Sequence, residues 1–567
     1  MASERLRLKE KRPVDANERT GCWVPDARAF TARKAEAEAH RSQVMAAALP
    51  SSIGALFDKA AQLYGERPFW VPIDGQGASY SYAAFNRETD RCGAALAAIG
   101  VGKGTHVAVM LPNVAEFAIA WIALAKLGAV LLPVNTAYTA REIEYVLSNA
   151  DAEFLIIGSN YLDRYRVIED GDRIARDHIV LWGEAVAGYP NTWARLMEQA
   201  SPDAMPAVQV GHDDLAAIQY TSGSTGFPKG CMLGQLYWLT IGRVRMAQGP
   251  QVSRILIDTP FFYMGPQWRM LMAAYQGATL YVAMRFSLSG FSERIRAHDI
   301  DFAYAPDQVA KLPVAAGEIN SLKWIAIAGV ARDLQRKMET MFNSPVREIY
   351  GMTEIGAALN MLADDRLMVG SGSCGIEAPF RTCRIVDADG QDVKPGEVGE
   401  LRVTGPGILQ GYYKNPEATA AAFDGPWFRT GDLFRQDDNG YFYFVGRRKD
   451  IIRRSNQNIS AVEIESILAA IPEVHQAAVV PVPDAFRGEE IKAYIVLRPG
   501  VTAERASPGY LADCCASQLA VYKLPRYFEY IDAMPLTSSN KIAKPDLIRR
   551  KDDLRQGSYD RIEGVWR

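Results

Sequence analysis

The sequence predicts an α/β protein: a large N-terminal domain of parallel-rich sheets covered by helices, with a β-barrel-like part, and a small α+β domain at the C-terminus. The chain has 567 residues, more than one hydrophobic core usually serves. From Ser51 onward, helical patterns alternate with short, wholly apolar segments, which is typical of parallel sheets covered on both faces. In the second half, strand-like segments accompany turn signals such as Asp389-Gly390.

The elements of the first half follow from their apolar spacing. Ile53–Tyr64 is helical and His106–Leu111 is strand-like. A predicted helix at Ala115–Leu127 and a predicted strand at Ala129–Val134 form the most apolar region of the chain. This region is short for a membrane span and carries Lys126, so we expect a buried helix rather than a transmembrane segment.

The second half predicts a different mixture of elements. Strand-like segments are Gly399–Val403, Gly440–Phe444 and Ile491–Leu497, and helices are expected at Val462–Ala470 and Tyr510–Leu519.

Three parts are predicted along the chain. Residues 1–48 are polar and helix-prone, and we expect this extension to pack on the body, with a partner-binding arm as the alternative. Residues 49–446 form the large domain. The basic stretch Gly446-Arg-Arg-Lys-Asp450 marks the boundary, and residues 447–567 have the size of a small independent domain.

Composition excludes several classes of protein. The formal net charge of −3, from 63 basic and 66 acidic residues, gives no reason to expect nucleic acid or an anionic membrane as a partner. The seven cysteines are scattered without a C-x-x-C pair, which favours a reducing cytoplasm, and the six histidines lack the spacing of a zinc site. The sequence leaves open whether the protein is a homodimer.

A glycine-rich stretch, Tyr220-Thr-Ser-Gly-Ser-Thr-Gly-Phe-Pro-Lys-Gly230, follows the apolar run Leu215–Tyr220, and a helical pattern resumes near Gln235. Glycines allow backbone N–H groups to converge on one point, hydroxyls add donors and Lys229 adds a charge. We therefore expect this loop to bind a polyphosphate.

Two other interpretations of the loop explain less. A P-loop NTPase needs a residue with an N–H before its lysine and Ser or Thr after it, whereas this chain has Pro228 and Gly230. Such a motor or GTPase would also release orthophosphate. A plain Gly/Ser surface loop explains the composition but not the Pro-Lys-Gly ending.

A candidate metal ligand lies in Tyr350-Gly-Met-Thr-Glu354, after the strand-like Val346–Ile349. A carboxylate beside a phosphate loop needs a cation between them, so Glu354 suits Mg²⁺. Thr353 could hydrogen-bond the α-phosphate of a nucleotide, and Tyr350 offers a flat face for adenine. The alternative for Glu354 is a solvated acid at a helix start.

A candidate ribose ligand lies in Trp427-Phe-Arg-Thr-Gly-Asp432. A carboxylate in a tight Thr-Gly-Asp turn can accept hydrogen bonds from both ribose hydroxyls. The alternative is an ordinary β-turn aspartate.

Together these stretches resemble the acyl-adenylate-forming superfamily, the AMP-dependent acyl-CoA synthetases and ligases, over roughly residues 50–550. The segments Asn458-Ile-Ser460, Val462-Glu-Ile-Glu465 and Asn540-Lys541-Ile542 are most similar to the crotonobetaine/carnitine–CoA ligase branch.

The resemblance implies roles for individual residues. Lys541 bridges the substrate carboxylate and the α-phosphate, Arg447 assists at the ribose, and Lys449 is the hinge about which a mobile small domain rotates between adenylation and thioester formation. The catalytic set implied is Lys229, Thr353, Glu354 and Lys541, with Glu354 as the Mg²⁺ ligand. The nucleotide-binding set implied is Thr221, Ser222, Gly223, Ser224, Thr225, Gly226, Gly329, Val330, Ala331, Tyr350, Gly351, Asp432 and Arg447.

The chain departs from the family pattern near the expected CoA channel, which Ser455, Asn456 and Gln457 border. Asn456 stands where most members carry glycine, and a larger side chain there could narrow the channel. Asn540 also replaces a common glycine, and the segment Ala328–Ala331 lacks a usual proline. Because of Asn456, an acceptor other than free CoA is the alternative for the second step.

The segment Pro260-Phe-Phe-Tyr-Met264 matches the family's gating segment, and the expected acyl pocket includes Phe262 and Tyr263 from it and Trp268 shortly after it. An aromatic wall could bind a quaternary ammonium such as that of carnitine through cation–π attraction, and it suits an apolar or ring-containing acid equally well. The alternative is that these rings belong to the core.

The sequence thus predicts a cytoplasmic ATP-dependent carboxylic acid–CoA ligase. It would activate a small-molecule acid as acyl-AMP with release of pyrophosphate and then transfer the acyl group to CoA, using ATP and Mg²⁺. A non-catalytic nucleotide-binding regulator is the rival of another class, but Lys229, Glu354, Asp432, Arg447 and Lys541 are all present.

Overall fold

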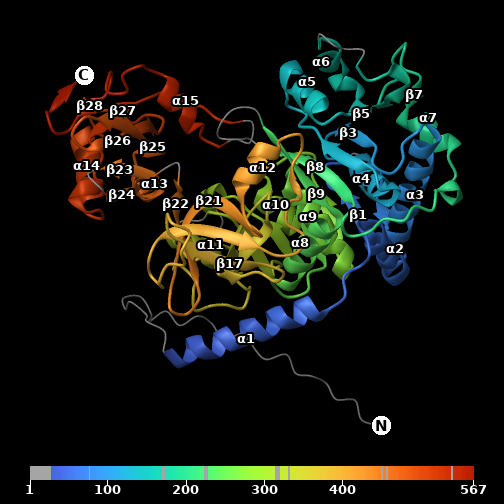
Figure 1. The fold of residues 1–567 in the computed structure, drawn as a ribbon, viewed down its shortest axis with the longest axis horizontal. Helices are drawn as coiled ribbons and strands as arrows, with labels where there is room; N and C mark the ends of the chain where they lie inside the picture. Colours follow the sequence, from blue (N-terminus) through green and yellow to red (C-terminus); the bar gives the residue numbers. More distant parts are fainter. Residues whose placement is uncertain are drawn as a thin grey trace.

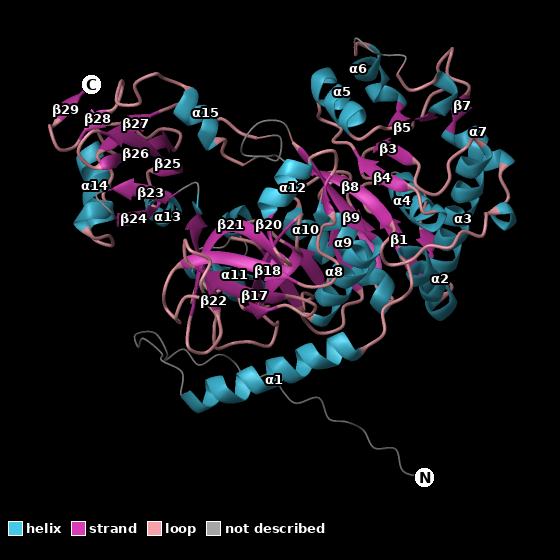
Figure 2. Cartoon of the chain, viewed as in Figure 1, coloured by secondary structure: helices cyan, strands magenta, loops and turns pink. Residues whose placement is uncertain are grey.

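The computed structural model describes residues 27–75, 77–168, 173–221, 228–312, 319–329, 332–448, 451–454, 457–537 and 541–567 (Figure 1). Within these ranges the strands form four sheets, and the helices lie beside them (Figure 2). The architecture is the predicted mixed α/β fold, with a large N-terminal domain and a smaller C-terminal domain.

The first described sheet has eight strands in the order β19-β9-β8-β4-β3-β5-β6-β7. The strands from β8 to β7 are parallel, whereas β8, β9 and β19 pair antiparallel at one edge. The strands are β3 (His106–Met110), β4 (Val130–Pro133), β5 (Phe154–Gly158), β6 (Ile179–Trp182), β7 (Asn191–Thr192), β8 (Leu215–Thr221), β9 (Lys229–Gly234) and β19 (Gly411–Tyr412). The accompanying helices are α2 (Ile53–Tyr64), α3 (Tyr82–Ala98), α4 (Ala115–Leu127), α5 (Ala140–Asn149), α6 (Leu162–Arg166) and α7 (Trp193–Gln199).

Helix α4 confirms the prediction of a buried helix in the most apolar region. It is apolar on nearly all sides, and Trp121 packs edge-on against Trp238 with ring centroids 5.1 Å apart. Trp238 belongs to α8 (Gln235–Ala247). No helix in the described ranges combines the length and the apolarity that crossing a membrane requires.

The second sheet has nine strands in the described residues, in the order β16-β15-β14-β13-β12-β10-β11-β1-β2. Its strands are β1 (Pro68–Pro72), β2 (Tyr80–Ser81), β10 (Arg254–Ile257), β11 (Thr279–Val282), β12 (Phe302–Tyr304), β13 (Trp324–Ile327), β14 (Val346–Met352), β15 (Gly356–Asn360) and β16 (Ile376–Glu377). Its helices are α9 (Met264–Gln276), α10 (Phe291–Ala297) and α11 (Arg332–Phe342). One core cluster joins side chains from both sheets and from α4, α8 and α9, so the two sheets pack on a shared part of the core.

The third described sheet is antiparallel and contains β17 (Thr382–Val386), β18 (Gly399–Thr404), β20 (Phe423–Asp424), β21 (Trp427–Gln436) and β22 (Phe442–Arg447). The short helix α12 (Pro416–Ala422) precedes β20. The pairing of β21 with β22 sets Asp432 opposite Arg447, which positions two of the predicted site residues.

The fourth sheet lies in the C-terminal part, which forms a separate lobe in Figure 1. Its described strands are β23 (Ile451–Arg454), β24 (Gln457–Ser460), β25 (Val474–Asp484), β26 (Gly488–Leu497), β27 (Tyr527–Tyr530), β28 (Tyr559–Asp560) and β29 (Val565–Trp566). Its helices are α13 (Ala461–Ala470), α14 (Pro508–Ala516) and α15 (Lys544–Arg549). The change of sheet therefore falls between Arg447, the last residue of β22, and Ile451.

Helix α1 (Ala27–Ala46) runs along the outside of the large domain (Figure 1). The Arg33 guanidinium lies 2.5 Å from Asp364, Nε2 of His40 lies 2.8 Å from the Ala247 carbonyl oxygen, and Arg41 donates to the Arg381 carbonyl oxygen at 2.5 Å. The described part of the N-terminal extension thus packs on the body, through these polar contacts and through apolar side chains such as Val44 and Phe30.

Candidate functional site

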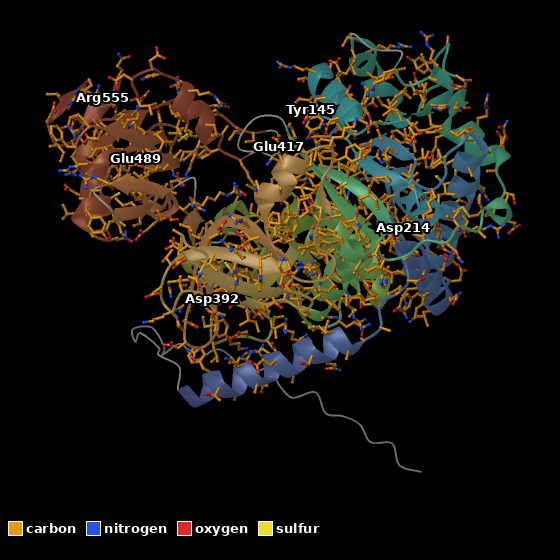
Figure 3. The ribbon with its side chains drawn as sticks, viewed as in Figure 1. Tyr145, Asp214, Asp392, Glu417, Glu489 and Arg555 are labelled. Atoms are coloured by element: carbon orange, nitrogen blue, oxygen red, sulfur yellow. The ribbon has the colours of Figure 1, made fainter. Side chains whose placement is uncertain are left out.

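The ends of the glycine-rich loop are held by strand pairing, while Ser222, Gly223, Ser224, Thr225 and Gly226 lie outside the described residues. Thr221, the last residue of β8, pairs with Lys229, the first of β9. The hydroxyl of Tyr145 on α5 (labelled in Figure 3) donates to the Pro228 carbonyl oxygen at 2.8 Å.

Strand β9 was not predicted from the sequence, which indicated only a helical pattern resuming near Gln235. A methyl group at Gly230 would lie 2.7 Å from Cγ2 of Ile218, so glycine permits the close pairing of the two strands. The result is a hairpin in which Lys229 points from a strand and not from a helix start.

Glu354 lies in the turn between β14 and β15 and is 8 % exposed. Its Oε1 accepts a hydrogen bond of 2.9 Å from the Tyr412 hydroxyl, and Lys229 Nζ lies 4.9 Å from the centre of the same tyrosine ring. Burial raises the pKa of Glu354, whereas the Tyr412 hydrogen bond and the charges of Lys229 and Arg447 lower it. One buried carboxylate therefore lies within the field of two cations.

Tyr412 was missed by the sequence analysis. It belongs to the two-residue strand β19, which pairs with β9, so it reaches Glu354 only through the tertiary fold. The adjacent aromatics in Gly411-Tyr412-Tyr413 are a weak local signal of such a role.

Asp432 is the centre of a second polar group. Its Oδ2 accepts a hydrogen bond of 2.7 Å from the Tyr350 hydroxyl, and Arg447 Nε lies 3.6 Å from Oδ1. The backbone N–H of Asp432 donates to Thr430 Oγ1 at 3.1 Å, which fixes the turn. Burial and the Asp432 charge together raise the pKa of Tyr350. Tyr350, whose contact with adenine stays a prediction, is thus bonded to the Asp432 carboxylate.

Backbone geometry explains the glycines at this end of the site. Gly329 has φ +71°, and its N–H donates to Glu348 at 2.5 Å. A Cβ on Gly351 would lie 2.1 Å from the Gly356 carbonyl oxygen, so the β14–β15 pairing requires glycine there. Thr353 lies half-buried in the same turn as Glu354, and Val330 and Ala331 lie outside the described residues.

Lys541, from the C-terminal part, lies within electrostatic range of the large domain's site. Part of its side chain reaches solvent, yet withdrawal from bulk water lowers the pKa of its ammonium; Arg447 lowers that pKa further, and Asp432 opposes the shift. The backbone N–H of Lys541 donates to Thr537 Oγ1 at 3.2 Å. The structure thus brings Lys541 near Asp432 and Arg447.

The predicted hinge and CoA-channel residues are mostly outside the described part of the chain. Lys449, Ser455 and Asn456 lie there, and Gln457 begins β24, where its backbone pairs with Arg454.

The predicted acyl-pocket residues cluster where β10 leads to α9. The rings of Phe262 and Tyr263 are 4.6 Å apart, and the Asn135 amide lies 3.4 Å from the Tyr263 hydroxyl. Phe262 and Trp268 are buried within a core cluster, whereas Tyr263 is only half-buried, and their role in an acyl pocket stays a prediction. The guanidinium carbons of Arg245 and Arg269 lie 5.5 Å and 5.8 Å from the Trp268 ring centre.

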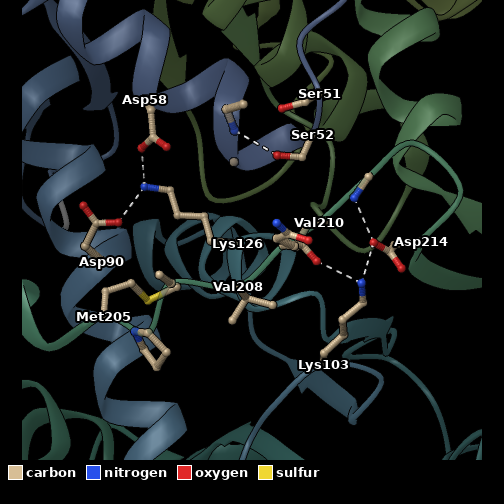
Figure 4. Close-up of a pocket in the computed structure, with 16 residues that line it drawn as sticks. Ser51, Ser52, Asp58, Asp90, Lys103, Lys126, Met205, Val208, Val210 and Asp214 are labelled. Carbon is tan, nitrogen blue, oxygen red and sulfur yellow. Dashed lines mark hydrogen bonds and ion pairs between the residues drawn. The ribbon is translucent and has the colours of Figure 1, made fainter.

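A cavity of about 700 Å³ lies elsewhere, between α2, α3, α4 and residues 205–214 (Figure 4). None of the predicted site residues lines it. Its charged groups are paired with one another, because Lys126 binds Asp58 and Asp90 and Lys103 binds Asp214. These pairs leave the cavity walls without a free charge of the kind that a phosphate or a carboxylate would need.

The residues present are compatible with a single magnesium ion. Within the described ranges no group of three or more His, Cys, Asp or Glu side chains is gathered as metal ligands would be. Mg²⁺ bound with a nucleotide commonly needs only one or two protein carboxylates, and Glu354 supplies one with little else bonded to it.

The fold and this group of residues define an acyl-adenylate-forming enzyme. Residues 57–413 match the AMP-binding enzyme family, and residues 463–541 match the AMP-binding enzyme C-terminal domain. The chain belongs to the AMP-binding enzyme family. Within it, the protein is an AMP-forming acyl-CoA ligase, which activates an acid through an acyl-adenylate.

Similar proteins agree with this assignment. An uncharacterized acyl-CoA ligase of Bacillus subtilis, YtcI, is 30 % identical over 502 residues, covering 86 % of this chain and 93 % of the relative. The crotonobetaine/carnitine–CoA ligase of Salmonella paratyphi A is 29 % identical, covering 87 % and 98 %. Among solved structures, o-succinylbenzoate CoA synthetase of Bacillus subtilis with its acyl-adenylate is 27 % identical with a TM-score of 0.75, covering 88 % of this chain and 98 % of that one. ATP-bound MatB of Rhodopseudomonas palustris is 25 % identical with a TM-score of 0.79, covering 88 % and 99 %.

Proposed function

We propose that the protein is an ATP- and Mg²⁺-dependent carboxylic acid–CoA ligase and that each charged side chain of the site has its own role in the reaction. The observation that carries the proposal is the convergence of Lys229, Glu354, Asp432, Arg447 and Lys541, which come from distant segments. The Arg447 charge acts on Glu354, Asp432 and Lys541 alike.

The first step joins the acid to AMP. A carboxylate oxygen attacks the α-phosphorus of ATP, the bond to the β-phosphate breaks, and pyrophosphate leaves with its electron pair. The carboxylate and the triphosphate are both anions, so cations must neutralise the carboxylate and phosphate oxygens as these approach each other. Lys541 would bridge the carboxylate and the α-phosphate, and Lys229 would act on the phosphates.

The remaining groups would hold the nucleotide. Asp432 would accept the ribose hydroxyls, with Arg447 beside it and Tyr350 keeping its carboxylate in place. Glu354 would hold Mg²⁺, which when bound would neutralise phosphate charge. Thr353 and the loop residues would donate hydrogen bonds to phosphate oxygens.

The second step transfers the acyl group. The CoA thiol releases its proton to solvent and its sulfur attacks the acyl carbon; the bond from that carbon to the AMP oxygen breaks, AMP leaves with the electron pair, and a thioester forms. Rotation of the C-terminal domain about Lys449 would withdraw Lys541 and admit the thiol. A cytoplasmic setting would supply both ATP and CoA, and the scattered cysteines are compatible with it.

The test is product analysis with purified protein, ATP, Mg²⁺ and a panel of short, long, aromatic, dicarboxylic and betaine-type acids, each with and without CoA. We expect acid-dependent release of pyrophosphate, with AMP and acyl-CoA accumulating together only when CoA is present. Release that is indifferent to CoA would support another acceptor, the alternative that Asn456 raises. Orthophosphate, or no nucleotide product, would reject the proposal.

A further inference from the structure

Arg245 is a buried cation for which the ligase reaction as described has no use. It lies on α8 and is 3 % exposed. Its Nη1 donates to Oε1 of Gln248 at 2.9 Å and to Oδ1 of Asn360 at 3.1 Å, both neutral amides. Its Nε has no hydrogen-bond partner, and no carboxylate among the described residues forms an ion pair with it.

Other buried arginines of the large domain are better compensated. Arg269 lies 3.7 Å from Asp258 and donates to the Leu256 carbonyl oxygen and to Thr259. Arg381 donates to four backbone carbonyl oxygens, those of Ile355, Phe380, Pro406 and Gly407. An incompletely bonded buried charge is costly, so its retention needs a reason.

The position of Arg245 supplies that reason. Its guanidinium faces Trp268 of the predicted acyl pocket at 5.5 Å. Asn360, one of its two amide partners, is on β15, the strand that leads away from Glu354. Tyr237, also on α8, lies within electrostatic range of both Arg245 and Glu354. Arg245 therefore lies beside Trp268 and is hydrogen-bonded to the strand that follows Glu354.

We infer that Arg245 binds a second anionic group at the far end of the acyl substrate, so that the preferred acid is a dicarboxylic acid activated at one end. This inference rests on the proposed ligase function and names its substrate class. A carboxylate can accept hydrogen bonds from Nε and from the neighbouring terminal nitrogen in one plane.

The charge of Arg245 also argues against a quaternary ammonium substrate. Burial lowers the pKa of Arg245 to about 10, which leaves the guanidinium protonated at neutral pH. The Trp268 ring already faces Arg245 and Arg269, so a further cation would meet repulsion where the aromatic wall was expected to attract it.

The experiment compares straight-chain monocarboxylic acids with dicarboxylic acids of the same carbon number, by pyrophosphate release. The enzymes are the wild type, Arg245→Met, which removes the charge but keeps much of the length, and Arg243→Met. Arg243 is the matched control, because it lies two residues away on α8 and faces Tyr275 at 5.6 Å. Calorimetric binding of the same acids without ATP provides a readout independent of turnover.

We expect the wild type and Arg243→Met to prefer the dicarboxylic member of a pair. Arg245→Met should lower kcat/KM for that member by about 30-fold or more and leave the monocarboxylic acid nearly unchanged. Equal use of both members by the wild type would overturn the inference and leave the ligase function standing. A preference that Arg245→Met retains would also overturn it.

Two further outcomes keep the inference separable from the proposed function. If no acid releases pyrophosphate, the proposed function fails, and equal calorimetric affinity of the wild type for both acid classes would then overturn the inference as well. If Arg245→Met does not fold, Arg245→Lys keeps the charge without the planar fork. Its dicarboxylate preference should be reduced, and an undiminished preference would reject the fork geometry on which the inference depends.

Discussion

Tyr412→Phe removes one hydroxyl group from the site and leaves the aromatic ring that Lys229 contacts. The Tyr412 hydroxyl donates a hydrogen bond of 2.9 Å to the Glu354 carboxylate, and Glu354 is 8 % exposed. A hydrogen bond to a charged group is worth about 1.5–3 kcal/mol, and one pKa unit corresponds to about 1.4 kcal/mol. Loss of the bond should therefore destabilise the ionised carboxylate and raise the pKa of Glu354.

The sign of the effect on activity follows from the charge state that binds Mg²⁺. Burial already raises the pKa of Glu354, and the Tyr412 hydrogen bond opposes that shift. The ionised carboxylate is lost as the pH falls through this pKa. The acidic limb of the pH profile should consequently move to higher pH in Tyr412→Phe, with adenylation at alkaline pH affected least.

The assay is kcat/KM for acid-dependent pyrophosphate release as a function of pH, at fixed Mg²⁺. Tyr413→Phe is the control, because the neighbouring hydroxyl binds Asp151 at 2.9 Å instead of Glu354. Superimposable acidic limbs for the wild type and both variants would refute the reasoning that Tyr412 keeps Glu354 ionised.

Three further substitutions test other parts of the account. Lys541→Ala should lower adenylation by orders of magnitude yet spare thioester formation from supplied acyl-AMP; equal loss of both half-reactions, measured separately, would reject its role. Asn456→Gly should raise the CoA-dependent rate without changing pyrophosphate exchange, and an unchanged or lower rate would exclude a narrowed channel. Gly230→Ala should destabilise the protein by about 1–3 kcal/mol in thermal unfolding, because its Cβ would lie 2.7 Å from Ile218. Gly102→Ala, where an added Cβ meets nothing within 4 Å, should be nearly neutral, and equal melting temperatures for the two would contradict the packing argument.

The fold class and several elements could be predicted because their signals are local. Helix α4 occupies the predicted residues 115–127, since its composition suits no other environment, and α2 likewise spans its predicted range. Strand β9 had no such signal. Its six residues include two glycines and a lysine, and it exists because β8 and β19 provide partners on both sides.

The candidate site shows the same division. Glu354, Asp432 and Lys541 could be proposed from short motifs in a fixed order along the chain. Tyr412 and Arg245 could not be proposed in this way. Tyr412 is notable because it contacts Glu354, which lies 58 positions away in the sequence. Arg245 is notable because it is buried beside neutral amides and not beside a carboxylate. Contacts of this kind depend on tertiary packing, which local patterns do not encode.

The central claim is that a substrate carboxylate becomes joined to the α-phosphate of ATP at the group formed by Lys541, Asp432 and Arg447. The most direct measurement uses an acid whose carboxylate carries heavy oxygen, with ATP, Mg²⁺ and CoA, and follows the label by mass spectrometry of the products. An acyl-adenylate requires one labelled oxygen to appear in AMP when the thiol displaces it. Label in orthophosphate or pyrophosphate, or AMP without label, would contradict the claim.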